Sequence, residues 1–184
     1  MKKKHFFLIS ILLISLINYS QETINFKGKY YNATPIWNFY CEDYAYSTKL
    51  KTQIAKTENG GILKLSIETS SENLFIGDKI LIVLKDGSLI YCGDKNIHEN
   101  FGKEKTTYYL LTNLEINKLK IFKIENIRFQ IIGKETKFSS KTGYFLASKK
   151  VNYKEESEKK DSVNTALDIK LLFKNKELIL KNKK

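Results

Sequence analysis

The chain has 184 residues, of which 42% are hydrophobic, 28% charged and 12% aromatic, and it contains a single proline. This length and composition indicate one folded domain and exclude collagen-like, low-complexity, disordered and disulfide-dense proteins. The formal charge of +12 suggests an anionic partner. However, Arg128 is the only arginine, the lysines are spread along the chain, and nucleic-acid readers favour the guanidinium group. We therefore expect no nucleic acid partner.

The first twenty residues have the pattern of a secretory signal peptide. Lysines at positions 2–4 precede residues 6–17, which carry no charge. This apolar run is shorter than the ~20 residues that a helix needs to cross a bilayer, and Ser20 offers a small residue for cleavage before Gln21. We expect export to the periplasm or the medium, a mature charge of +9 and no stable membrane span. An uncleaved anchor or a buried helix is the alternative.

Alternating strands dominate the first half of the mature chain. Apolar and polar residues alternate, which predicts strands at 24–26, 37–41, 50–54 and 63–67. The pair Asp86-Gly87 between residues 80–84 and 88–92 predicts a tight hairpin turn. The unbroken apolar run 80–84 predicts a strand that is covered on both faces.

The next segments predict a loop, a helix and further strands. Polar residues 93–107 indicate a loop, before a strand at 108–111. Thr112 and Glu115 have the spacing of a capping box, which predicts a short helix to about Lys120. Residues 124–132 indicate a strand with Arg128 opposite its apolar face, and a hairpin around residues 141–143 follows.

The character of the chain changes after residue 148. A mixed-charge run at 154–161 precedes Val163, Ala166, Leu167 and Leu171, whose spacing predicts a helix with Ser162 as a candidate N-cap. The expected organisation is a signal peptide at 1–20, a β-rich domain at 21–148, and a charged segment, C-terminal helix and Lys-rich tail at 149–184. The predicted fold is mainly β: an antiparallel β-sandwich, or alternatively an open β-barrel, with one short internal helix and a C-terminal helix.

The mature chain has two cysteines, Cys41 and Cys92. An even number in an oxidising compartment favours a disulfide. Closing a loop of about 50 residues would stabilise the fold by ~3–4 kcal/mol in the chain-entropy model. Two buried thiols are the alternative.

Catalytic patterns are sparse. His98 is the only histidine outside the first twenty residues, which excludes a site with several histidines from one chain, and we expect no metal or cofactor. Cys92, Asp94 and His98 lie close in the sequence, but a nucleophilic cysteine must be an activated thiol. Asp78, Asp86 and Asp94 are candidates for a carboxylate pair, since a glycosidase needs only two carboxylates at the right separation.

Aromatic residues are concentrated between positions 30 and 46. Tyrosines on an exposed face can stack on sugar rings, because they combine an apolar body with a polar edge. The candidate ligand-binding residues are Tyr30, Tyr31, Tyr40, Tyr44 and Tyr46. The alternative is that this cluster, with Trp37 and Phe39, packs in the core or at the sheet edge.

Several short segments of the sequence resemble small exported β-rich proteins of the flavobacterial kind. They are Ala33-Thr34-Pro35, Trp37, Cys41, Ile54-Ala55-Lys56, Gly60-Gly61, Leu84-Lys85-Asp86-Gly87, Cys92, Asp94-Lys95, Tyr109-Leu110 and Ile127-Arg128-Phe129. The resemblance covers residues 30–147 and implies export and a β-rich fold, but no site residues.

The expected function is that of an exported, non-enzymatic β-sandwich module with a binding or structural role at the cell envelope. Its partner would be an envelope component or a glycan. The alternatives are a carbohydrate-binding module that uses the tyrosines, and a secreted hydrolase with paired carboxylates.

Overall fold

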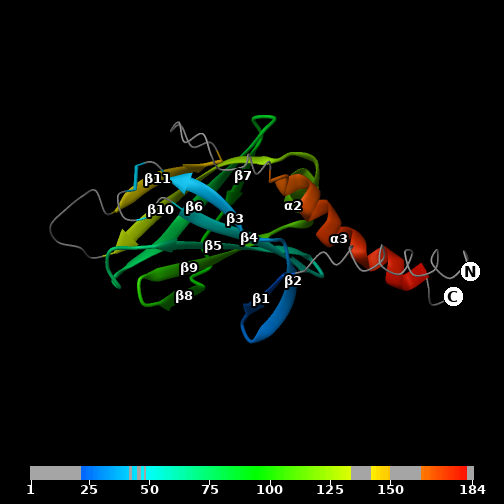
Figure 1. Cartoon of the computed structure of the whole chain (residues 1–184), viewed down its shortest axis with the longest axis horizontal. Helices are drawn as coiled ribbons and strands as arrows, with labels where there is room; N and C mark the ends of the chain where they lie inside the picture. Colours follow the sequence, from blue (N-terminus) through cyan, green and yellow to red (C-terminus); the bar gives the residue numbers. More distant parts are fainter. Residues whose placement is uncertain are drawn as a thin grey trace, which may run out of the picture.

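The computed structural model describes residues 22–41, 43–44, 47, 49–133, 142–149 and 163–181, with 175–181 described by backbone alone. The predicted signal peptide, the mixed-charge run, Tyr46 and the candidate N-cap Ser162 lie outside these residues. The described strands are β1 (Glu22–Phe26), β2 (Lys29–Ala33), β3 (Trp37–Cys41), β4 (Lys49–Thr57), β5 (Gly60–Glu68), β6 (Leu74–Leu84), β7 (Leu89–Cys92), β8 (His98–Phe101), β9 (Glu104–Leu111), β10 (Ile124–Gly133) and β11 (Gly143–Ser148). The described helices are α2 (Asn113–Ile121) and α3 (Thr165–Lys181) (Figure 1).

The strands form an antiparallel sheet in the order β7-β6-β10-β11-β3-β4-β5-β9-β8. The β1–β2 hairpin joins this sheet through β4. The sheet curves so that β6 meets β9, where the Thr107 hydroxyl donates a hydrogen bond of 2.7 Å to the carbonyl oxygen of Ile76. The sheet does not close into a barrel. The predicted sandwich-like antiparallel fold, with one internal helix and one C-terminal helix, is confirmed.

Two apolar layers hold the fold together. The main core lies inside the curved sheet, where alternate residues of the strands point inward, as the alternation at Trp37, Phe39 and Cys41 predicts. A second, smaller cluster lies where the β1–β2 hairpin covers the other face of β4, β5 and β9; its residues are Ile24, Phe26, Ala33, Ala55, Ile62 and Tyr108.

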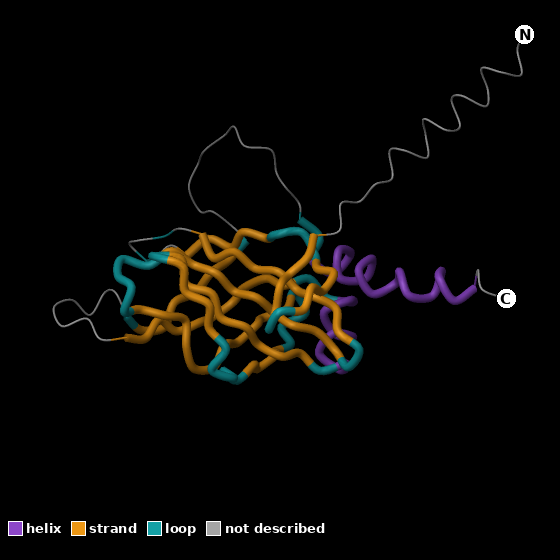
Figure 2. Tube along the Cα trace, turned by 90° about the horizontal axis from the view of Figure 1, so that it is seen from below, coloured by secondary structure: helices purple, strands orange, loops and turns teal. Residues whose placement is uncertain are grey.

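Both helices lie at one end of the sheet (Figure 2). Helix α2 begins with the predicted capping box of Thr112 and Glu115. Helix α3 is fixed by the Trp37 indole, whose Nε1 donates to Asp168 Oδ2 at 2.9 Å, and by Thr165 Oγ1, which accepts from the Ile124 backbone at 2.9 Å. Within the described residues, neither helix combines the length and apolar character that crossing a membrane requires.

The buried stripe of α3 differs from the predicted one. Ala166 is buried as expected, but Leu167 is 45% exposed. Thr165, Ile169 and Leu172 are the other buried positions among the described side chains of α3, and Ile169 belongs to the main core. The helix begins later than the pattern suggested, since the Asn164 side chain accepts from the Leu167 backbone.

The loop predicted at residues 93–107 is wrong from residue 98 onward. Strands β8 and β9 form a hairpin there, with Gly102 in the left-handed region at φ +56°. Lys105 is only 1% exposed, and its ammonium group donates to the carbonyl oxygens of Gly102 at 2.7 Å and Glu72 at 3.1 Å. Because backbone carbonyls satisfy this buried charge, a polar sequence folds as an interior strand.

The expectation that residues 80–84 are covered on both faces is also wrong. Ile80, Ile82 and Leu84 are buried, whereas Leu81 and Val83 are only half-buried. Strand β6 therefore has one core face and one outer face on which apolar side chains reach the surface.

Candidate functional site

The tyrosines between positions 30 and 44 do not form one surface. Tyr30 is 71% exposed on β2, whereas Tyr31 points to the opposite side and packs against Phe26 at a ring-centroid distance of 6.5 Å. Tyr40 is half-buried on β3. Tyr44 is 1% exposed, and its ring packs on Phe145 with centroids 4.8 Å apart. Tyr44 is therefore a core residue and is not available to a ligand platform.

The predicted Cys41–Cys92 disulfide is absent from the structure, which holds both cysteines as buried thiols. The sheet order explains why: β11, β10 and β6 separate β3, which carries Cys41, from β7, which carries Cys92. Neighbouring strands lie about 4.8 Å apart, while a disulfide requires Cα atoms within about 7 Å. The two thiols belong to one core but to distant strands.

Two successive polar contacts join the side chains of Asp94, His98 and Thr107. Asp94 Oδ2 is 3.3 Å from His98 Nε2, and His98 Nδ1 is 2.9 Å from Thr107 Oγ1. The residue types match a nucleophile, base and orienting acid. However, Thr107 is fully buried and its hydroxyl donates to Ile76, so no substrate reaches it. The hydrogen bonds of His98 and Thr107 instead connect β8, β9 and β6, and Asp94 joins them from the segment before β8.

Cys92 is not an activated nucleophile either. Burial, with a smaller contribution from the charge of Glu115, raises the pKa of its thiol to about 12. A nucleophilic cysteine needs the thiolate, which this environment disfavours. The chemistry suggested by the spacing of Cys92, Asp94 and His98 therefore lacks its reacting group.

The aspartates have separate local roles. Asp86 Oδ1 accepts hydrogen bonds from the backbone and hydroxyl of Ser88 in the β6–β7 turn, and the bond from the hydroxyl lowers the pKa of Asp86. Asp94 Oδ1 accepts from the Asn96 backbone. Asp78 Oδ2 accepts from the Tyr144 hydroxyl at 3.4 Å. The paired-carboxylate hydrolase therefore stays a prediction.

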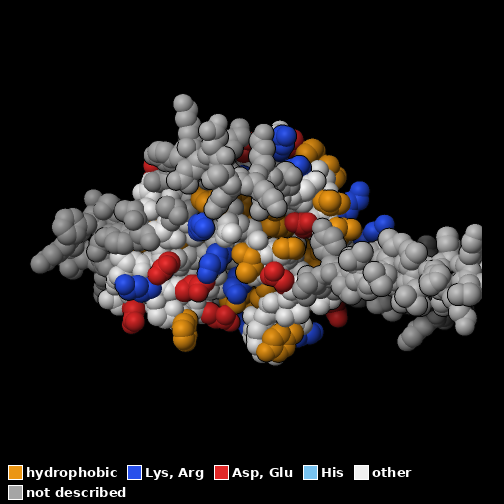
Figure 3. Space-filling model, viewed as in Figure 1, with side chains coloured by type: hydrophobic (Ala, Val, Ile, Leu, Met, Phe, Trp, Pro, Cys, Tyr) orange, Lys and Arg blue, Asp and Glu red, His pale blue; other side chains and the backbone are white. Residues whose placement is uncertain are grey.

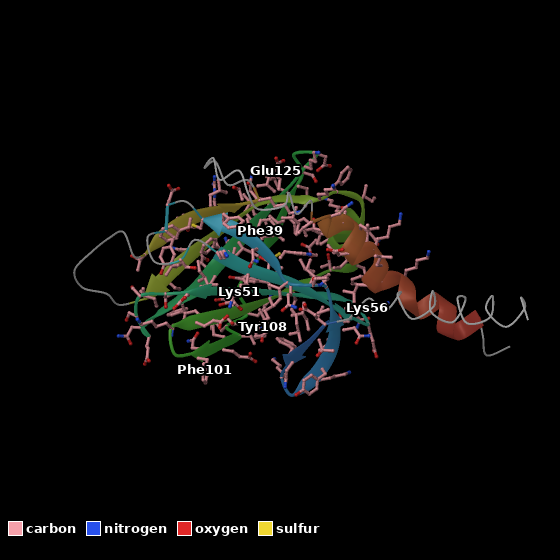
Figure 4. The ribbon with its side chains drawn as sticks, in the orientation of Figure 1. Phe39, Lys51, Lys56, Phe101, Tyr108 and Glu125 are labelled. Carbon is pink, nitrogen blue, oxygen red and sulfur yellow. The ribbon has the colours of Figure 1, made fainter. Side chains whose placement is uncertain are left out.

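The outer face of β4, β5 and β9 carries mixed charge. Figure 3 shows basic and acidic side chains interspersed there, and Lys51 forms an ion pair with Glu104 at 3.0 Å. A recess of about 740 Å³ lies beside this pair, and Phe101, which is 90% exposed, projects at its rim (Figure 4). Because both signs of charge line the recess, it has no single-sign field that would favour a charged ligand.

A different surface combines aromatic and cationic groups. In register, Tyr91 of β7 pairs with Leu81 of β6, Leu81 pairs with Arg128 of β10, and Arg128 pairs with Leu146 of β11. These four residues form one row that spans about 14 Å at the usual strand spacing. We name this surface the Arg128 face and define it by six residues: Leu81, Leu89, Tyr91, Arg128, Tyr144 and Leu146.

The Arg128 face is open to solvent. Tyr91 and Tyr144 are each 65% exposed, Leu89 is 41% exposed and Leu146 is 42% exposed. Their strand neighbours Ile90, Phe145 and Ala147 are buried, so the two sides of this part of the sheet are clearly distinguished. The outer side is thus a sheet face on which large apolar side chains of β6, β7 and β11 lie near the Arg128 cation.

Sequence reasoning placed Arg128 correctly, opposite the apolar side of its strand, but missed the surface around it. Tyr91 and Tyr144 are 53 positions apart and come to lie on one face only because β6 and β10 join β7 to β11 in the sheet. The available signal was the alternation in residues 89–92 and 143–148, which puts both tyrosines opposite buried residues.

No group of three or more His, Cys, Asp or Glu side chains that could hold a metal ion occurs in the described part of the chain.

Comparisons with protein family models, curated proteins and solved structures found no match.

Proposed function

We propose that the chain is an exported, non-catalytic binding module that attaches to a component of the cell envelope through the Arg128 face. The observation that carries the proposal is the pair of tyrosines, each 65% exposed, that flank a lone arginine on one side of an ordered sheet. Export rests on the basic and apolar pattern of the first twenty residues.

Physical reasons favour a contact surface over an ordinary exterior. Contiguous exposed apolar side chains keep unfavourable contact with water, and patches of this kind mark interaction sites. Tyrosine and arginine are also the residue types that contribute most to binding energy at contact surfaces. Since antiparallel strands hold the backbone of the row, little backbone conformational entropy is lost when a ligand binds.

The experiment measures retention of the purified protein on washed, insoluble envelope material. The variant Tyr91→Ala/Tyr144→Ala removes both rings and should weaken retention by about tenfold or more. Tyr30→Ala is the matched control, because Tyr30 is 71% exposed but lies on β2, outside the Arg128 face. Circular dichroism checks that all variants are folded.

Equal retention of the wild type and the double variant would contradict the proposal. Weaker retention of Tyr30→Ala alone would move the contact surface to the β1–β2 hairpin.

A further inference from the structure

A recess of about 430 Å³ lies at one end of the Arg128 face. Its lining includes Arg128, Tyr144 and Leu146, together with Asp43, which follows β3. This volume falls within the usual range of small-molecule sites, about 300–1,000 Å³. The recess therefore has room for one ligand unit, and the row from Arg128 to Tyr91 continues beyond it.

The charges of the recess are separate and opposite. Among the described residues, neither Arg128 nor Asp43 takes part in an ion pair, although both line the same recess. The guanidinium group offers only donors and the carboxylate only acceptors. A ligand that fills the recess is thus met by both kinds of hydrogen-bonding group, with almost no net charge.

Apolar surface completes the recess. Tyr144 presents an exposed ring, and its hydroxyl donates to Asp78 Oδ2 at 3.4 Å, which orients the side chain. Leu146 lies beside Arg128 across the β10–β11 ladder. An apolar body with a polar edge suits a ligand of the same amphipathic kind.

We propose that the Arg128 face binds a neutral glycan, with one sugar ring in the recess between Arg128, Asp43 and Tyr144. This inference rests on the proposed function. Sugar hydroxyls both donate and accept hydrogen bonds, so they satisfy the carboxylate and the guanidinium group together, while the C–H face of the ring covers the tyrosine. The remaining rings of the chain extend along the row toward Leu81 and Tyr91.

Charge argues against the competing occupants. Arg128 would attract an acidic glycan, but Asp43 would repel it. A cationic ligand would be attracted by Asp43 and repelled by Arg128. A second copy docked by a two-fold axis that passes beside Arg128 would bring the two Arg128 side chains together, because residues at the axis of such an interface meet their own copies. A neutral polyhydroxylated chain avoids both penalties.

The test is isothermal titration calorimetry of the purified protein with laminarin, mannan and dextran as neutral probes, and alginate and polygalacturonate as acidic probes. Arg128→Lys keeps the positive charge but loses the planar guanidinium group, which can donate two parallel hydrogen bonds. Tyr144→Ala removes the aromatic ring. Asp43→Asn removes only the negative charge. Tyr30→Ala is the control outside the site.

We expect a neutral probe to bind with little dependence on salt. Arg128→Lys, Tyr144→Ala and Asp43→Asn should each weaken binding by about tenfold, and Tyr30→Ala by less than about twofold.

Other results overturn the inference. Salt-sensitive binding of an acidic probe that strengthens in Asp43→Asn would replace the neutral glycan by an acidic one. Retention on envelope material that depends on Tyr91 and Tyr144, without binding of any neutral probe, would leave the proposed function standing and remove the glycan. Loss of self-association in Tyr144→Ala, measured by sedimentation, would identify a second copy as the occupant and remove both.

Discussion

Burial decides what the two cysteines of the chain can do. Cys41 and Cys92 are 1% and 3% exposed, and their strands are not neighbours in the sheet. They therefore serve as small apolar side chains, which is the common role of a buried thiol. The expected oxidising compartment and the even number of cysteines favoured a bridge, but the strand order prevents it.

The thiols should be inert in the folded protein. We expect no modification by iodoacetamide at pH 8 under native conditions, because burial both shields Cys92 and keeps it protonated. In guanidinium chloride, without reductant, both cysteines should be alkylated. Intact mass spectrometry measures the number of adducts. Labelling that appears only after reduction would contradict the buried thiols and restore the disulfide.

The raised pKa of Cys92 predicts a loss of stability in alkali. In the unfolded chain the thiol ionises near its ordinary value of 9.0, whereas in the folded protein it ionises near 12. Between these pH values the folded state binds more protons than the unfolded state. The contribution of the Cys92 thiol to the free energy of unfolding is therefore complete below pH 9 and is lost as the pH rises toward 12.

Comparison with Cys92→Ala isolates this effect. Between pH 8 and pH 10.5, the free energy of unfolding should fall by about 2 kcal/mol more in the wild type than in the variant. Tyr108 and Tyr109, whose pKa values burial raises, contribute equally to both proteins. Urea titrations at the two pH values provide the measurement, and identical losses would argue against a perturbed thiol.

The β4–β5 hairpin depends on close approach of its backbone to a neighbour. Gly60 has φ +138°, and a Cβ atom there would collide with the carbonyl oxygen of Leu111 on β9. Since a backbone oxygen cannot move aside, Gly60→Ala should destabilise the protein by about 3 kcal/mol or more. Gly28→Ala is the control, because Gly28 also has a positive φ, +77°, but nothing lies within 4 Å.

The control should cost about 1 kcal/mol, which is the strain of a left-handed residue alone. Urea-induced unfolding of both variants compares the two positions. Equal losses would show that crowding by Leu111 is unimportant.

Helix α3 depends on a polar contact as well as on apolar packing. The hydrogen bond from Trp37 Nε1 to Asp168 Oδ2 joins it to β3. Asp168→Ala leaves the indole donor without this charged acceptor and should cost about 2 kcal/mol, whereas Asp168→Asn keeps an acceptor and should cost less. Urea unfolding followed by tryptophan fluorescence measures both effects. If the two variants lose the same stability, the charge rather than the hydrogen bond matters.

Export concerns the whole molecule and is open to a direct measurement. Intact mass spectrometry of the natively produced protein should give a chain that begins near Gln21, because cleavage follows the small residue at position 20. A full-length mass from a protein recovered in the cytoplasmic fraction would remove export from the proposed function. The Arg128 face would then need a partner inside the cell.

Local features of the fold follow from short-range chemistry and could be predicted. The alternation in Trp37–Cys41 and the capping box at Thr112 depend on residues within a few positions of each other. The β6–β7 hairpin is of the same kind: Gly87 supplies a positive φ of +84°. These elements form as expected because the nearest neighbours decide them.

Other features depend on partners far away in the chain. Lys105 is buried only because the carbonyls of Gly102 and Glu72 surround its ammonium group, so its polar segment could not be identified as a strand. The Arg128 face has the same origin, since its tyrosines come from strands that the sheet order places on either side of β6 and β10.

The sequence by itself determined the β-rich class, the helix start at Thr112 and the side of the strand on which Arg128 lies, because periodicity and capping act over a few residues. Only the tertiary structure decided that Cys41 and Cys92 stay apart, that Tyr44 is core and that Tyr91, Arg128 and Tyr144 share one open face. Strand order is set by the burial of the whole core, so no local pattern encodes which distant strands become neighbours.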